Sequence, residues 1–240
     1  LPVVAALGGT FPEAEIDWVV ETRHADLLAG NPFIHRLIRL DTLGWRKRLI
    51  SGSTIKSVAR GVATLRQAEY DAAIDLQGLY KSALIARLSR SRMRIGFAEQ
   101  WLREPTAGVL YTERVAPRGA THVIEMNMAL VERLGARSVP REGWQFHLPR
   151  TEADDQYVEQ QLAGSGSDDF MVINPGGGWK NKCWAPENYA ELIRRLAGEI
   201  AGNIFLTGSS AEEPLIREII RTADSPRAKY IPSTITQFIA

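Results

Sequence analysis

The stretch that decides the fold is FMVINPGGGWKNKCWAPENYAELIRRL, residues 170–196. It opens with a short apolar run, which is typical of a buried strand. Three consecutive glycines follow at 176–178, and glycines this dense weaken a regular helix or strand. Pro186 then stands where a helix can begin, because its missing N–H costs nothing at that point. Apolar residues recur after it on one helical face: Tyr189, Leu192, Ile193 and Leu196. The order of strand, glycine turn and helix predicts one unit of an α/β fold.

Similar units lie on both sides of this stretch. Expected strands cover residues 15–20, 34–40, 71–78, 92–97 and 203–208. Expected helices cover residues 53–70, 80–89, 122–135 and a segment through Leu215, Ile216 and Ile219. Strands that alternate with helices predict parallel sheets joined by crossover helices.

Residues 136–155, ARSVPREGWQFHLPRTEADD, interrupt the alternation. They contain two prolines and have no helical period, so we interpret the segment as a linker centred near 140–150. The linker predicts two α/β domains, residues 1–145 and residues 146–240.

Composition excludes several classes of protein. Of the 240 residues, 45% are hydrophobic and 24% are charged, as in an ordinary globular protein. Apolar runs are all shorter than the ~18 residues that span a bilayer. Cys183 is the single cysteine, which excludes an internal disulfide and a cysteine-based zinc site. The first residues lack the basic start of a signal peptide, so the cytoplasm is the expected compartment.

Charge divides unevenly along the chain. Residues 1–145 carry 20 Lys and Arg against 15 Asp and Glu, a net charge of +5. Residues 146–240 carry 9 against 13, a net charge of −4. The first half is therefore expected to meet an anionic ligand, and scattered surface charge is the alternative.

Two turns follow neighbouring expected strands, and both suit a nucleotide. Gly176–Gly178 can bring backbone N–H groups close to a phosphate, and Lys182 can add positive charge. In LTGSSAEEP, 206–214, Gly208 follows the strand and Glu212 lies near the next helix start, where it can accept from both ribose hydroxyls. A tight turn with solvated lysines and a helix-capping acid are the alternatives. Neither turn matches the dinucleotide fingerprint or a Walker loop.

The same segments resemble a known family. NPGGGWKNKCWAPENYAELIRRLA, 174–197, is similar to the nucleotide-sugar loop of glycosyltransferase family 9, the bacterial heptosyltransferases. TGSSAEE, 207–213, resembles the next turn of that family, in which a glutamate holds the ribose. YDAAIDLQGLYKSALIARL, 70–88, and GFAEQWLREP, 96–105, resemble its Asp-x-Gln-Gly-Leu-x-Lys-Ser and Arg-Glu-Pro signatures. The likeness covers nearly the whole chain and is strongest to the heptosyltransferase I branch.

The resemblance implies a GT-B fold, with two Rossmann-like domains whose parallel sheets face across a cleft. It also implies inverting transfer of heptose from ADP-heptose to the acidic Kdo and lipid A inner core, without a metal or other cofactor. Residues 146–240 would bind the donor and residues 1–145 the acceptor. The expected donor-binding residues are Gly176, Gly177, Gly178, Lys182, Gly208 and Glu212. The expected acceptor-binding residues are Arg46, Lys47, Gln77, Lys81 and Arg103.

Two family features have no counterpart in the sequence. The first strand with its Gly-Asp turn, which carries the proposed catalytic aspartate, would precede Leu1, and the late Asp-Thr-Gly-x-x-His loop would follow Ala240. The chain is therefore expected to be trimmed at both ends, and the catalytic residue stays unassigned.

Other functions remain open from the sequence. One is a GT-B transferase with a UDP or GDP donor, because the base is not readable from these residues. Another is a non-catalytic module that binds a nucleotide or a lipid. Contact with the inner face of the inner membrane is an option for the basic cluster around Arg46 and Lys47, and no nucleic-acid partner is expected.

Overall fold

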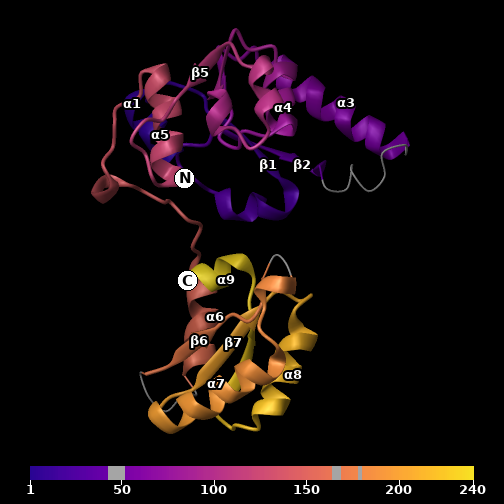
Figure 1. The fold of residues 1–240 in the computed structure, drawn as a ribbon, viewed down its shortest axis with the longest axis vertical. Helices are drawn as coiled ribbons and strands as arrows, with labels where there is room; N and C mark the ends of the chain where they lie inside the picture. Colours follow the sequence, from indigo (N-terminus) through magenta and orange to yellow (C-terminus); the bar gives the residue numbers. More distant parts are fainter. Residues whose placement is uncertain (43–51, 164–168, 178–179) are drawn as a thin grey trace. The chain divides into compact units, whose positions relative to one another are not determined.

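A computed structural model describes residues 1–42, 52–163, 169–177 and 180–240. The chain divides into two compact units, Leu1–Leu148 and Pro149–Ala240, which are described separately here (Figure 1). The break lies three residues beyond the boundary expected from the sequence, within the proline-containing segment 136–155.

The first unit contains two small parallel sheets. β1 (Asp17–Glu21) pairs with β2 (Arg36–Leu40), and their first residues are direct partners. The second sheet has the order β3-β4-β5. Its strands are β3 (Ala72–Ile74), β4 (Met93–Phe97) and β5 (Glu113–Val115). All these pairings are parallel, so the carboxyl ends of paired strands lie at one edge of each sheet.

Helices connect and cover these strands. They are α1 (Pro2–Thr10), α3 (Gly52–Gln67), α4 (Tyr80–Leu88) and α5 (Val123–Leu134). Short 3-10 turns are η1 (Thr22–Leu28), η2 (Glu99–Trp101), η3 (Pro105–Leu110) and η4 (Arg141–Gly143). α1 packs against α5 (Figure 1), and α4 packs against η3. Buried residues from α4, β4, η3 and α5 form one core that holds the second sheet in place.

The second unit is a three-stranded parallel sheet with the order β6-β7-β8. Its strands are β6 (Met171–Ile173), β7 (Ile204–Gly208) and β8 (Ala228–Pro232). Its helices are α6 (Glu152–Leu162), α7 (Pro186–Glu199), α8 (Glu213–Ala223) and α9 (Ile235–Ile239), with the 3-10 turn η5 (Lys180–Lys182). α7 and α8 pack against each other, and α6 packs against α9 (Figure 1). β7 is the central strand, so residues 204–207 are buried on both faces.

The structure corrects the sequence interpretation in several places. Residues 152–155 belong to α6 and not to a linker, because Thr151 caps this helix by accepting from the Asp154 N–H. α1, β5, β8 and α9 were not expected. β3 ends at Ile74, so Gln77 and Gly78 lie in the turn after the strand and not in the strand itself. No helix within the described residues is long and apolar enough to cross a bilayer.

Candidate functional site

The two turns of the second unit lie side by side at one edge of its sheet. β6 and β7 pair in parallel with Ile173 opposite Leu206, so both strands end at the same edge. Gly176 follows the end of β6, and Gly208 is the last residue of β7. In open α/β sheets, ligands bind outside this carboxyl edge.

The Glu212 carboxylate joins the two turns. Its Oε2 accepts from the Ser209 N–H at 2.8 Å and from the Ser209 hydroxyl at 2.7 Å. Its Oε1 lies so close to Gly176 that a Cβ built there would be 1.7 Å away. A Cβ at Gly208 would lie 3.1 Å from Oε2. Glycine at 176 is therefore needed for the carboxylate to sit between the two turns, whereas at 208 an added Cβ would ask for only a small shift.

The rest of the glycine turn is more open. The Gly176 N–H donates to Asn174 Oδ1 at 3.1 Å, which shapes the start of the turn. Gly177 and Lys182 are exposed, and Gly178 lies outside the described residues. Trp184 is 57% exposed, with its ring 5.5 Å from that of Tyr189. The segment after β6 thus combines a bare backbone at Gly176, next to the Glu212 carboxylate, with an exposed cation and an exposed aromatic ring later in the segment.

In the first unit, Asp75 organises the turn that follows β3. Its Oδ1 accepts from the backbone N–H groups of Gln77 at 2.8 Å and Gly78 at 3.3 Å. Its Oδ2 accepts from the Ser82 hydroxyl at 2.7 Å and the Tyr111 hydroxyl at 2.6 Å. Burial and the bond to Asp75 raise the pKa of Tyr111. Asp75 is itself buried, so its role is to hold the turn and the start of α4.

Glu104 connects this turn with the Arg-Glu-Pro segment. Its Oε2 accepts from the Tyr80 N–H, the first N–H of α4, at 2.6 Å. The Glu104 N–H in turn donates to the Gly78 carbonyl at 3.4 Å. Gly78 has φ +67°, and a Cβ there would lie 3.1 Å from Leu102, so glycine suits this position. Two segments far apart in sequence thus form one structural element.

Only three of the five expected acceptor-binding residues lie within the described part of the chain. Gln77, Lys81 and Arg103 are exposed, in or beside this combined element. The Lys81 ammonium donates to the Thr42 hydroxyl at 2.9 Å. Arg46 and Lys47 lie outside the described residues. The structure therefore brings together the Gln77, Lys81 and Arg103 segments.

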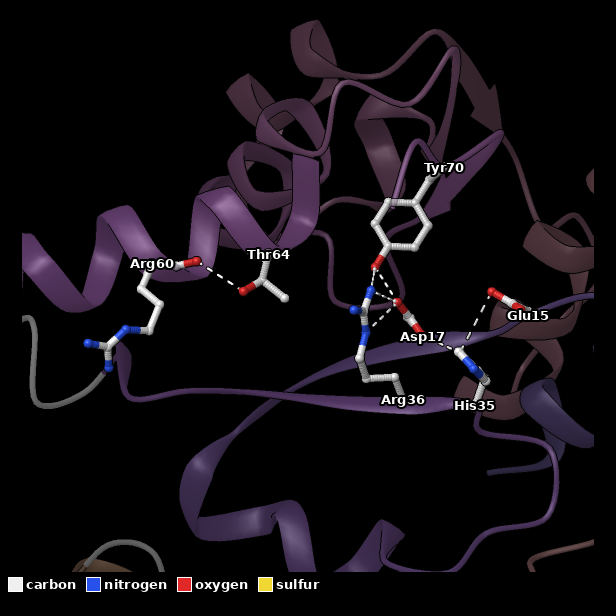
Figure 2. Close-up of polar contacts among 7 residues, drawn as sticks. All are labelled: Glu15, Asp17, His35, Arg36, Arg60, Thr64 and Tyr70. Atoms are coloured by element: carbon white, nitrogen blue, oxygen red, sulfur yellow. Dashed lines mark hydrogen bonds and ion pairs between the residues drawn. The ribbon is translucent and has the colours of Figure 1, made fainter. Parts of the chain in front are cut away.

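Another polar network of the first unit lies at the amino edge of the β1–β2 sheet, where both strands begin (Figure 2). Asp17 accepts from Arg36 Nη2 at 2.6 Å, from the Tyr70 hydroxyl at 2.5 Å, and contacts His35 Nδ1 at 3.3 Å. Burial alone would raise the pKa of Asp17, but the hydrogen bonds from Tyr70, Arg36 and His35 outweigh it and hold the pKa below its usual value. Burial and the same contact raise the pKa of Tyr70 to about 12. The network therefore connects the β1–β2 sheet to Tyr70 in the segment after α3, which suits a structural role.

Several important residues were not predicted. A local signal exists for Asp75, which lies in the Asp-x-Gln-Gly segment. An aspartate before a turn often accepts a hydrogen bond from the backbone N–H two residues later, as Asp75 does from Gln77. Glu104, Glu21 and Thr42 act through partners that are distant in sequence, so no local pattern identifies them. Within the described residues, no group of three or more His, Cys, Asp or Glu side chains is arranged to hold a metal ion.

The chain is similar in sequence to a known family of proteins. Residues 58–234 match the sequence model of glycosyltransferase family 9 (heptosyltransferase). Lipopolysaccharide heptosyltransferase 1 of Pseudomonas aeruginosa is 27% identical over 214 residues, 89% of this chain and 58% of the relative. The protein of the same name from Escherichia coli K12 is 30% identical over 201 residues, 82% of this chain and 60% of the relative. The chain thus spans about three fifths of the length of these relatives.

Solved structures agree on the fold. E. coli heptosyltransferase WaaC with ADP superposes with a TM-score of 0.77 at 23% identity, covering 99% of this chain and 72% of that one. E. coli ADP-heptose lps heptosyltransferase II gives a TM-score of 0.69 at 22% identity, with 99% and 70% covered. The GT-B class, with parallel sheets in both α/β units, is confirmed. Because the family model matches about three quarters of its residues, the chain belongs to glycosyltransferase family 9, the heptosyltransferases.

Proposed function

We propose that this protein transfers heptose from ADP-heptose to the Kdo and lipid A inner core of lipopolysaccharide, at the cytoplasmic face of the inner membrane. Family membership supports the reaction class, and relatives named lipopolysaccharide heptosyltransferase support the product. Two solved structures of similar fold contain ADP or an ADP-heptose analogue, which supports adenine as the donor base.

The observation that carries the proposal is the Glu212 carboxylate between the two strand-end turns. A carboxylate there can accept hydrogen bonds from ribose hydroxyls, while the glycine backbone after β6, which carries no side chain, would allow a phosphate to approach closely. Lys182, exposed beside the turn, adds a positive charge for the diphosphate. Together these groups match the sugar and the phosphates of a nucleoside diphosphate.

The first unit would bind the acceptor. Gln77, Lys81 and Arg103 expose two cations and an amide around one turn, which suits a ligand that carries carboxylates and phosphates. The net charge of residues 1–145, 20 basic against 15 acidic, supports an anionic partner. The lipid part of such an acceptor would bring the protein to the membrane surface.

The chemistry would be an inverting displacement. A base removes the proton of the acceptor hydroxyl, and that oxygen attacks the anomeric carbon from the face opposite ADP. The bond from the anomeric carbon to the diphosphate breaks through a transition state with oxocarbenium character, as in glycoside hydrolysis. Backbone N–H groups and Lys182 would stabilise the negative charge that develops on ADP, in place of a divalent cation. We assign the base to neither Asp17 nor Asp75, because both already hold hydrogen-bond networks.

The test is ADP binding by titration calorimetry on the full-length protein. Lys182→Ala removes a charge-assisted contact worth about 1.5–3 kcal/mol, or roughly 10- to 150-fold in Kd. Glu212→Ala should weaken binding to a similar extent through the ribose. Unchanged ADP affinity in both variants would exclude this site. Tighter binding of UDP or GDP than of ADP would instead favour another nucleotide-sugar donor, and binding without transfer would favour a non-catalytic module.

A further inference from the structure

Three elements of the first unit bring side chains together at the carboxyl edge of the β1–β2 sheet. Glu21 is the last residue of β1, and Thr42 follows β2 by two residues. Lys81 is in the first turn of α4. The Lys81 ammonium donates to the Thr42 hydroxyl at 2.9 Å, and this hydroxyl donates to Glu21 Oε2 at 2.5 Å. Lys81 Nζ lies 4.0 Å from the same oxygen.

The directions of these hydrogen bonds are mutually consistent. A hydroxyl can accept one hydrogen bond and donate another, and an ammonium has three donors. Thr42 therefore links the cation to the carboxylate, and the Lys81 ammonium still has donors for a ligand. The side chain of Glu21 is only 14% exposed, whereas that of Lys81 is 48% exposed. The carboxylate is thus a fixed, mostly covered anchor, and the ammonium faces solvent.

Such an anchor matters for a lysine in particular. The ammonium sits on a flexible four-carbon chain, and immobilising that chain costs side-chain entropy when a ligand binds. Lys81 also lies at a helix start, where the helix dipole disfavours a cation. The Thr42 and Glu21 contacts offset both effects before any ligand arrives.

We propose that Glu21 and Thr42 are positioning residues that hold the Lys81 ammonium ready for an anionic group of the acceptor. The inference rests on the proposed function, in which Lys81 binds the acceptor. It adds a specific prediction: Lys81 of α4 is held in place by Glu21 at the end of β1 and by Thr42 just after β2, and its contribution to acceptor binding depends on them.

The experiment is steady-state transfer by the full-length enzyme with varied acceptor. Thr42→Val removes the bridging hydroxyl at nearly constant shape, Thr42→Ser keeps it, and Glu21→Gln removes the anchoring charge. Thr42→Val and Glu21→Gln should each raise the acceptor KM by roughly tenfold, the effect of about one hydrogen bond. ADP affinity should stay at the wild-type value, and Thr42→Ser should restore the acceptor KM.

A matched control comes from the opposite edge of the same sheet. Tyr70→Phe removes a hydrogen bond to Asp17 and should lower Tm without changing the acceptor KM. A change of acceptor KM in Tyr70→Phe equal to that in Thr42→Val would mean that both act through the fold, which would overturn the inference.

Lys81→Ala separates failure of the inference from failure of the proposed function. If Lys81→Ala raises the acceptor KM while Thr42→Val and Glu21→Gln behave as wild type, Lys81 needs no positioning and the inference is wrong. If Lys81→Ala also leaves the acceptor KM unchanged, the acceptor assignment of the proposed function fails together with it.

Discussion

Gly176→Ala offers a sharp test of the donor site because the new methyl group would act on a single partner. The added Cβ would lie 1.7 Å from Oε1 and 2.3 Å from Cδ of Glu212. Non-bonded heavy atoms normally approach to about 3.5–4 Å, so the carboxylate must retreat by roughly 1.5–2 Å. The perturbation is a displaced Glu212, without loss of its charge.

The free energy of unfolding should change little. The atoms that must move are the end of a flexible side chain, and the Ser209 groups that bond to it are exposed. Water can replace those bonds, so we expect a loss of no more than about 1 kcal/mol. ADP binding should suffer more, because the ribose loses a charged acceptor worth about 1.5–3 kcal/mol, or roughly 10- to 150-fold in Kd.

Calorimetry with ADP measures this effect, and Gly198→Ala is the matched control. Gly198 lies in α7 with nothing within 4 Å of a Cβ built there. Alanine at a helical glycine adds about 0.5–1 kcal/mol of stability, and ADP affinity should stay at the wild-type value. A second control combines Gly176→Ala with Glu212→Ala. The alanine at 176 should then have little further effect, because its target is gone.

One result would refute the reasoning. If Gly176→Ala binds ADP like the wild type while Glu212→Ala binds it weakly, the carboxylate does not need its place between the two turns. The close approach of Gly176 would then be a packing feature, and Glu212 would act from another position.

Two further predictions concern the first unit. Asp75→Ala should lower the free energy of unfolding by about 3 kcal/mol or more in urea denaturation, because Tyr111 and Ser82 both lose a charged partner; a loss below that of Tyr111→Phe would contradict the assigned network. The pKa of Asp17 is lowered on folding, so its carboxylate stabilises the protein above its ordinary value of 3.8 and loses this effect as the pH falls further. The stability difference between wild type and Asp17→Asn should therefore be full near neutral pH and shrink below about pH 4, and a constant difference down to pH 2 would show that the charge does not matter.

Apolar periodicity predicted the elements that are buried on one face or on both. β7 opens with three consecutive apolar residues, 204–206, at the centre of its sheet, and α8 carries its apolar residues toward the same core. α5 ends where expected, because Gly135 has φ 103°, which glycine adopts readily. These features depend on residues that are close in sequence, so a short stretch of sequence is enough to predict them.

Other elements gave no such signal. α6 is a polar helix whose start depends on the Thr151 cap, and apolar spacing cannot detect it. In the candidate site, the glycines and Glu212 could be found because each follows a strand end. Glu21 and Thr42 could not be found, because their partner Lys81 lies about 40 or more residues away and only the folded chain brings them together.

The way α4 begins has a consequence for how such enzymes diversify. Its first N–H is already taken by Glu104, and the Leu79 N–H just before it is held by Ser82. With these two N–H groups occupied, an anion near this helix start relies more on side chains, such as those of Lys81 and Arg103 in the proposed function. Recognition by side chains can be changed by single substitutions, and the groups proposed to bind ADP belong to the other unit, where such substitutions do not reach. A lineage could then exchange acceptors one residue at a time while its donor stays the same.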